Sequence, residues 1–197
     1  MERKPLQIVH YPHPALRHPA RPIRRVDADL AGVVREMFDL MYAFKGIGLA
    51  ATQVGLPLRL FIANPAGQPG EGEEYVFINP VLSRPKGNEE AEEGCLSFPE
   101  LYGPVKRPKQ ITVNAYNLQG VEIKAELNGM LARVVQHEFD HLDGVLYIDR
   151  MSATARAAVQ PTLEEFELIL RSRRQTGEIP GDEVLAQQRA AWEARYV

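Results

Sequence analysis

The pentapeptide His137-Glu138-Phe139-Asp140-His141 has the residue types and the spacing of a metal site on a helix. Residues four apart on a helix lie one turn above each other, about 5–6 Å between Cβ atoms, so both imidazoles can reach one cation. Glu138 lies beside this pair, where its carboxylate can serve as the general base for a hydrolytic water. The alternative interpretation is two hydrogen-bonded histidines flanking a solvated glutamate. Other parts of the chain must decide between the two.

A tetrahedral catalytic site needs a third protein ligand and one position that stays open for water. Cys95, the only cysteine, follows a glycine, and its thiolate would suit Fe(II) or Zn(II). Glu164 or Glu165 is the alternative, a little over twenty residues beyond His141, as in some zinc proteases. A lone cysteine is also a common core residue. Taken alone, these residues leave the third ligand open.

A third stretch, residues 46–53, reads Gly-Ile-Gly-Leu-Ala-Ala-Thr-Gln. Two glycines around one apolar residue allow an extended peptide to approach the backbone closely, and Gln53 offers an amide donor. The alternative is the end of a helix followed by a tight turn into a sheet. No Lys-Ser or Lys-Thr follows the glycines, so the stretch is not a phosphate loop.

Hydrophobic periodicity predicts the elements that position these stretches. A helix is expected from Leu30 to Phe44, with Asp27 or Asp29 as its cap. A second helix is expected over residues 130–142, ending at Gly144, and it carries both histidines. Short strands are expected at 58–63 and 75–78, each closed by an Asn-Pro pair, and a hairpin at 111–115 and 121–127.

The two ends of the chain differ from this middle part. Residues 5–22 are rich in proline, which predicts an extended arm over the body. Near the other end a helix is expected to open at Pro161-Thr162, with Arg171, Arg173 and Arg174 at its close, before a final short helix. We interpret this last part as an appendage.

Composition excludes several classes of protein. The 197 residues are 45% hydrophobic and 25% charged, as in one ordinary globular domain. Lys plus Arg (23) nearly balances Asp plus Glu (26), so no strong field favours nucleic acid or anionic lipid. No apolar run approaches the roughly 18 residues of a membrane span, and residues 1–12 lack the apolar core of a signal peptide. We therefore expect a cytoplasmic protein with no membrane partner and no direct nucleic-acid specificity.

Together the three stretches resemble the peptide deformylases. That family carries G-x-G-x-A-A-x-Q, E-G-C-x-S and Q-H-E-x-D-H in this order, and residues 46–53, 93–97 and 136–141 match all three. Tyr11-Pro12, with Leu16-Arg17 after it, is similar to the family's N-terminal part. The resemblance covers about residues 5–155. It implies an α+β fold with small antiparallel β-sheets around a central helix, a catalytic domain at 1–155 and a helical appendage at 156–197.

The resemblance also implies a metal-dependent hydrolase that removes the N-formyl group from the N-terminal methionine of new proteins and releases formate. Its substrates would be N-formylmethionyl peptides and nascent chains, with transient ribosome contact. Cys95, His137 and His141 would hold one Fe²⁺, for which Zn²⁺, Ni²⁺ or Co²⁺ can substitute.

The remaining site residues are also implied by the resemblance. Glu138 would move the proton of the attacking water, and the Gln53 amide and the Leu96 N–H would stabilise the oxyanion. Gly48 and Gly94 would contact the peptide backbone. We further expect the methionine side chain of the substrate to lie against Met130 and Val134.

One departure and two other classes of protein bear on this assignment. Residues 99–103 read Pro-Glu-Leu-Tyr-Gly where some members have an arginine, so that loop carries no predicted substrate contact. A zinc endopeptidase would use the same histidines with a glutamate ligand, and Cys95 would be dispensable. A binding domain without activity would be expected to lose a ligand or Glu138, yet all are present.

Overall fold

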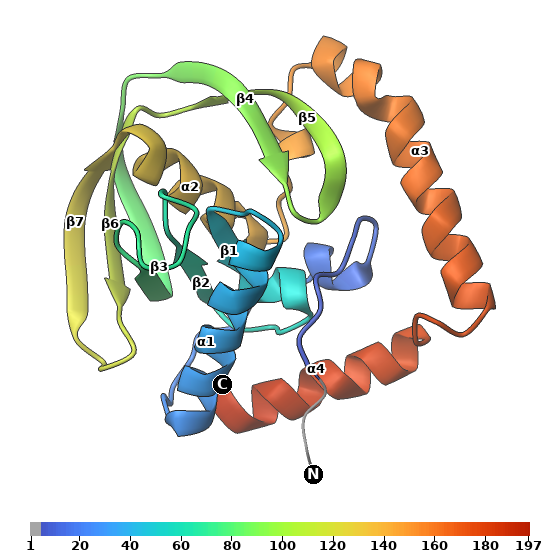
Figure 1. Ribbon diagram of the computed structural model, residues 1–197, viewed down its shortest axis with the longest axis horizontal. Helices are drawn as coiled ribbons and strands as arrows, with labels where there is room; N and C mark the ends of the chain where they lie inside the picture. The colour runs from blue at the N-terminus through green and yellow to red at the C-terminus, as the bar shows by residue number, and fades with distance from the viewer. Residues whose placement is uncertain (1–4) are drawn as a thin grey trace.

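The strands form two antiparallel sheets in this computed structural model, which describes residues 5–197 (Figure 1). Residues 1–4, which belong to the segment expected to lack a signal peptide, lie outside the described residues. One sheet has the order β1-β2-β3-β6-β7, and the other pairs β4 with β5. The strands are β1 (Gly48–Ala50), β2 (Leu60–Ala63), β3 (Tyr75–Lys86), β4 (Glu89–Cys95), β5 (Phe98–Arg107), β6 (Gln110–Tyr116) and β7 (Glu122–Asn128). The helices are α1 (Ala28–Ala43), α2 (Gly129–Leu142), α3 (Ala153–Gln175) and α4 (Asp182–Tyr196), with 3₁₀ turns at Pro14–Arg17, Ala51–Val54 and Tyr147–Asp149.

Helix α2 lies between the two sheets (Figure 1), which confirms the predicted α+β fold. Its apolar face, with Ala132, Val135 and Leu142, packs on the large sheet. Its other residues include His137 and Asp140, which contact β4 and β5. The helix is polar on one face because that face meets the small sheet, where the chemistry-bearing residues lie.

Helix α1 covers another part of the large sheet, and its predicted extent is confirmed. Of the two expected caps, Asp27 is the one in place, since its carboxylate accepts from Leu30 N at 2.9 Å. The apolar face of α1 packs with β1 and β2 in a fully buried cluster. This packing places Gly46 and Gly48 directly after the helix.

One strand prediction was wrong, and one hairpin was missed. The strand expected to close at Asn79-Pro80 continues to Lys86, because Asn79 adopts a left-handed φ of 50° and a register shift after Ile78 absorbs the irregularity. The β4–β5 hairpin was not predicted at all. Its strands contain five Glu residues, two glycines and two prolines, which conceal the alternation of apolar and polar residues.

The helix expected to open at Pro161 begins instead at Ala153. The hydroxyl of Ser152 accepts from Ala155 N at 3.2 Å and caps it, and four alanines in the first six residues favour helix. Pro161 lies inside α3 and is exposed. The boundary between a catalytic domain at 1–155 and an appendage at 156–197 stays a prediction. Helix α3 runs across that boundary without a break.

The end of helix α4 packs against the start of α1. Tyr196 is 1% exposed in the same apolar cluster as α1. Its carbonyl accepts from Arg24 N at 2.7 Å, and its hydroxyl lies 3.1 Å from Asp27 Oδ1. Among residues 5–197 no helix is both long and apolar enough to cross a membrane.

We predict that Gly144→Ala is more destabilising than Gly120→Ala. Both glycines have φ near +70°, which costs about 1–2 kcal/mol for alanine. A Cβ on Gly144 would lie 2.7 Å from the Arg17 carbonyl oxygen, whereas a Cβ on Gly120 meets nothing within 4 Å. Denaturant unfolding should show at least about 1 kcal/mol of additional loss for Gly144→Ala. Equal losses would contradict the close approach of the Arg17 carbonyl to Gly144.

Candidate metal centre

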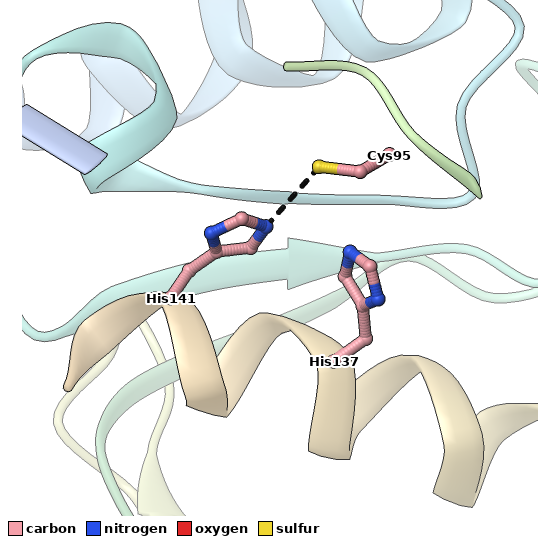
Figure 2. Close-up of side chains that lie close together, drawn as sticks. All are labelled: Cys95, His137 and His141. Atoms are coloured by element: carbon pink, nitrogen blue, oxygen red, sulfur yellow. Dashed lines mark hydrogen bonds between the residues drawn. The ribbon is translucent and has the colours of Figure 1, made fainter. Parts of the chain in front are cut away.

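Cys95 at the end of β4 lies beside His137 and His141 on α2 (Figure 2). One potential ligand atom from each residue lies within 4.8 Å of the other two, and Cys95 Sγ is 3.3 Å from His141 Nε2. One sulfur and two imidazole nitrogens are a donor set that binds Zn²⁺ or Fe²⁺ and leaves a position open. The structure therefore brings together the three predicted ligands.

The alternative third ligands lie elsewhere. Glu164 and Glu165 are exposed on α3, and Glu164 accepts a hydrogen bond from Gln160 at 3.1 Å. Neither belongs to the ligand group formed by Cys95 and the histidines. This placement removes the geometric basis of the endopeptidase interpretation.

The turn between β4 and β5 positions Cys95. Gly94 pairs with Tyr102, and a Cβ on Gly94 would lie 2.6 Å from the tyrosine ring. The register then shifts, so that Cys95 pairs with Phe98. A glycine is required before the cysteine because the Tyr102 ring occupies the space of a side chain. The predicted contact of Gly94 with substrate stays a prediction.

Glu93 is the centre of a buried ion-pair network next to the histidines. Its Oε2 lies 3.0 Å from His137 Nδ1, and its carboxylate receives two hydrogen bonds from Arg107 at 2.7 and 3.0 Å. Arg107 also donates to Asp140 at 2.7 Å, and Arg133 donates to Glu93 at 2.6 Å. With Nδ1 of His137 bound to Glu93, Nε2 is the nitrogen left for a metal.

The charges around the histidines are unequal. Burial opposes protonation of His137, yet hydrogen bonds with Cys95 and Glu93 outweigh this and raise its pKa to about 10. Burial, and then the charge of His137, lower the pKa of His141 well below its ordinary value. Since a metal ligand must be a neutral imidazole, His137 has to lose its proton when a cation is bound. Metal affinity therefore depends on pH.

Glu138 is buried against the edge strand β1. Burial raises its pKa to about 7, in spite of the positive charge of His137. Its Oε2 is buried without a hydrogen-bond partner among the described residues. A Cβ on Gly48 would lie 2.5 Å from Glu138 Oε1, so glycine at this position makes room for the carboxylate. The carboxylate is available to a bound molecule.

Gln53 reaches the same centre from the 3₁₀ turn after β1. Its Oε1 accepts from Ala50 N at 2.8 Å, which orients the amide. Its Nε2 lies 3.3 Å from Cys95 Sγ and 3.3 Å from Ser97 Oγ. An amide donor is thus held beside the potential ligands. Leu96 follows Cys95 directly in the chain. The predicted role of its backbone N–H in stabilising the oxyanion stays a prediction.

The sequence interpretation missed the residues that support the ligands. Glu93 and Asp140 both lie inside the matched motifs but were given no role, and Arg107 was not considered. Arg107 is 3% exposed, and Glu93 and Asp140 are also buried. Acidic residues inside metal motifs are a signal for such partners, because metal-bound histidines usually donate to a carboxylate or a carbonyl.

Comparison with known proteins agrees with this geometry. The family model described as polypeptide deformylase matches residues 5–157. A peptide deformylase of Rhodopirellula baltica is 55% identical over 192 residues, which cover 98% of this chain and 96% of that protein. The chain belongs to the polypeptide deformylase family. Peptide deformylases are metal-dependent hydrolases that remove the N-formyl group from the N-terminal methionine of proteins, so the predicted family and activity are confirmed.

Plant deformylases are also similar. A chloroplastic peptide deformylase 1B of Oryza sativa subsp. japonica is 47% identical over 164 residues, which cover 83% of this chain and 61% of that protein. The crystal structure of a plant peptide deformylase, PDF1B, has a TM-score of 0.85 and 40% identity, and the match covers 92% of this chain and 98% of that chain. The deformylase fold is therefore shared over most of the chain.

We predict that Glu93→Gln lowers the free energy of unfolding by about 3 kcal/mol or more, because Arg107 and Arg133 lose a buried counter-charge. Denaturant unfolding of the metal-free protein measures this. The control is Asp182→Asn, which removes an exposed partner of Arg174 and should change stability by less than about 1 kcal/mol. Similar effects of the two changes would contradict a structural role for the buried network.

Proposed function

We propose that this chain hydrolyses N-formylmethionyl peptides and nascent chains, with Cys95, His137 and His141 as the metal ligands. One observation supports this most strongly. The three potential ligand atoms converge within 4.8 Å, next to the buried Glu138 carboxylate, whose Oε2 has no protein partner among residues 5–197. A hydrolase needs this combination of a metal and an available base.

The bound metal is one Fe²⁺ in our proposal, with Zn²⁺, Ni²⁺ or Co²⁺ as substitutes. The divalent ion would supply Lewis-acid chemistry, which polarises the formyl carbonyl and makes water more acidic. The mixed sulfur and nitrogen donor set suits all four metals, and iron is inferred from the family.

Glu138 is the proposed proton carrier. Its Oε2 accepts the proton of the water that attacks the formyl carbon, and later gives it to the departing amine nitrogen. The Gln53 Nε2–H and the backbone N–H of Leu96 donate to the oxyanion that forms on the formyl oxygen. Ala50 N–H holds Gln53 by its Oε1, so the Nε2–H is already oriented before substrate arrives.

The substrate backbone is proposed to lie along β1. This strand pairs with β2 on one side and is at the edge of its sheet, so Gly48 can hydrogen-bond an extended peptide. Gly94 lines the other side. For the methionine side chain we retain Val134, which is 5% exposed and close to Gly48, and Met130, which is 56% exposed.

We also propose a cytoplasmic location and transient contact with the ribosome. A bacterial relative supports the cytoplasm, whereas the rice relative is named chloroplastic. The segment at 156–197 is the proposed appendage to a catalytic domain at 1–155. At the end of α3, Arg173 pairs with Glu178 and Arg174 with Asp182.

We predict that Glu138→Gln retains the metal and loses about 10²–10⁴-fold in kcat, because an amide cannot accept the proton of water. Formate release from formyl-Met-Ala-Ser and elemental analysis of anaerobically purified protein give the two quantities. Glu126→Gln, an exposed change on β7, is the control. Normal turnover by Glu138→Gln would remove this residue from the mechanism.

We predict that Cys95→Ser loses most of its bound metal, while Glu164→Ala and Glu165→Ala retain both metal and activity. The reason is that only the cysteine lies with the histidines. Metal content per chain, measured for all three variants, distinguishes the cysteine variant from the two glutamate variants. A metal-replete Cys95→Ser protein and a metal-free glutamate variant would favour a zinc peptidase instead.

We predict that Gln53→Ala lowers kcat by about 10²-fold with little change in metal content, as expected for the loss of one oxyanion donor. Steady-state kinetics with formyl-Met-Ala-Ser test this. An increase in KM alone would mean that Gln53 binds substrate without stabilising the transition state.

A further inference from the structure

A cavity of about 870 Å³ lies away from the metal-ligand group, between the N-terminal arm, α3 and α4. The arm comprises residues 5–13, and Figure 1 shows α3 and α4 as a bracket beside it. Ligand clefts usually have about 300–1,000 Å³. The apolar lining includes Phe166 and Ile169 from α3 and Leu185 and Trp192 from α4. None of the residues assigned above to the reaction is among its lining residues.

The arm is held to the body along one edge. Val9 N–H donates to the Gln53 carbonyl at 2.8 Å, and Tyr11 N–H donates to the Ser97 carbonyl at 2.9 Å. Two bonds from residues two apart, to the same side, are the pattern of an extended strand. The peptide groups between them therefore point to the opposite side.

The opposite edge of the arm is unpaired only over a short stretch, because the Leu6 N–H donates to the Glu36 carboxylate and the His10 carbonyl accepts from His13 N at 2.9 Å. Within residues 5–197 the backbone N–H groups of Ile8 and His10 have no acceptor, and the Ile8 carbonyl has no donor. Both residues line the cavity. A short strand edge thus faces a space with apolar walls, and it can form main-chain hydrogen bonds with another extended peptide.

The uncompensated charge on this cavity is positive. Glu178 and Arg173 both line it, and they pair with each other at 2.6 Å. Arg189 also lines it and has no ion-pair partner in the described part of the chain. Burial, and then the nearby Arg174 and Arg189, lower the pKa of His13 to about 4, so this buried histidine is neutral. A carboxylate is the group that would complement Arg189.

We propose that this cavity binds an extended peptide segment of a partner protein. The segment adds a strand to the free edge of Ile8 and His10, places alternate apolar side chains against α3 and α4, and pairs one acidic side chain with Arg189. A strand is favoured over a lipid-like carboxylate because the free edge offers both a donor and an acceptor on Ile8; a peptide backbone pairs with both, whereas a carboxylate has no hydrogen to donate to the Ile8 carbonyl. This site is independent of the proposed reaction.

Trp192 is the only tryptophan of the chain and lines the cavity, so its fluorescence reports on occupancy. The full-length protein is titrated with an acetylated hexapeptide of alternating valine and glutamate. We expect a saturable change in Trp192 emission. Replacing glutamate by lysine, or N-methylating alternate peptide bonds on the hydrogen-bonding edge, should each weaken binding about tenfold or more.

Two neighbouring residues on α3 give matched variants. Ile169 is 48% exposed and lines the cavity, whereas Leu168 is 61% exposed and lies outside its lining. Ile169→Ser should weaken binding of the valine-glutamate peptide, whereas Leu168→Ser should leave its affinity unchanged. Arg189→Glu should make the protein prefer the lysine peptide to the glutamate peptide. Formate release should be unchanged in all three, which shows that they are folded.

Three results would overturn the proposal. They are equal binding of the N-methylated peptide, equal affinity of the two serine variants, and saturable binding of decanoate without binding of the peptide. The last result would make the cavity a site for a small amphiphilic anion. Protection of the Ile8 and His10 amides from hydrogen exchange by the unmethylated peptide would support strand addition directly.

Discussion

The ion pairs of Arg107 hold the metal-ligand group together. Arg107 ends β5 and binds Glu93 on β4 and Asp140 on α2 at once, with 4%, 6% and 7% of the three side chains exposed. Each buried charge costs several kcal/mol of desolvation, which is offset only when all partners are in place. The small sheet and α2 therefore have one favourable relative position. That position sets the separation of Cys95 from the two histidines.

A second constraint concerns space. The side chain of Glu138 fits against β1 because residue 48 has no Cβ, and Gly94 lies under the ring of Tyr102 for the same reason. Both glycines are therefore required by packing within the folded chain. A contact with substrate would be an additional demand on the same positions. The two roles are compatible because a missing side chain leaves the backbone accessible.

The sequence predicted the parts of the fold and site that depend on short-range spacing. The spacing of His137 and His141, the apolar face of α1 and the 111–127 hairpin are all local patterns, and the structure contains each of them. The small sheet was missed because buried charge replaces apolar residues in it. In β5 every second residue from Leu101 onward is buried, but Gly103 and Arg107 occupy two of those positions. A period of two in hydrophobicity is then not visible, although the period of two in burial is present.

The partners of Cys95 could be found only through the family resemblance. Its contact with His141 joins residues 46 positions apart, and nothing in the local sequence distinguishes it from an inert core cysteine. The ion pairs of Arg107 also join residues far apart in the sequence, since Glu93 lies on β4 and Asp140 on α2. Long-range pairing of this kind is decided by tertiary packing rather than by propensity.

The burial of Tyr196 among residues of α1 has a consequence for synthesis. Segments of a growing chain fold as they emerge, and the segment made first waits for its later partners. Here the apolar face of α1 and the capping carboxylate of Asp27 acquire a contact from a residue 169 positions later. Strands β1 and β2 can cover most of this face early, but the part that Tyr196 covers stays open until almost all of residues 28–196 have been translated. An unfinished chain would therefore expose an apolar surface to chaperones, and the docking of α4 would be among the last events of its folding.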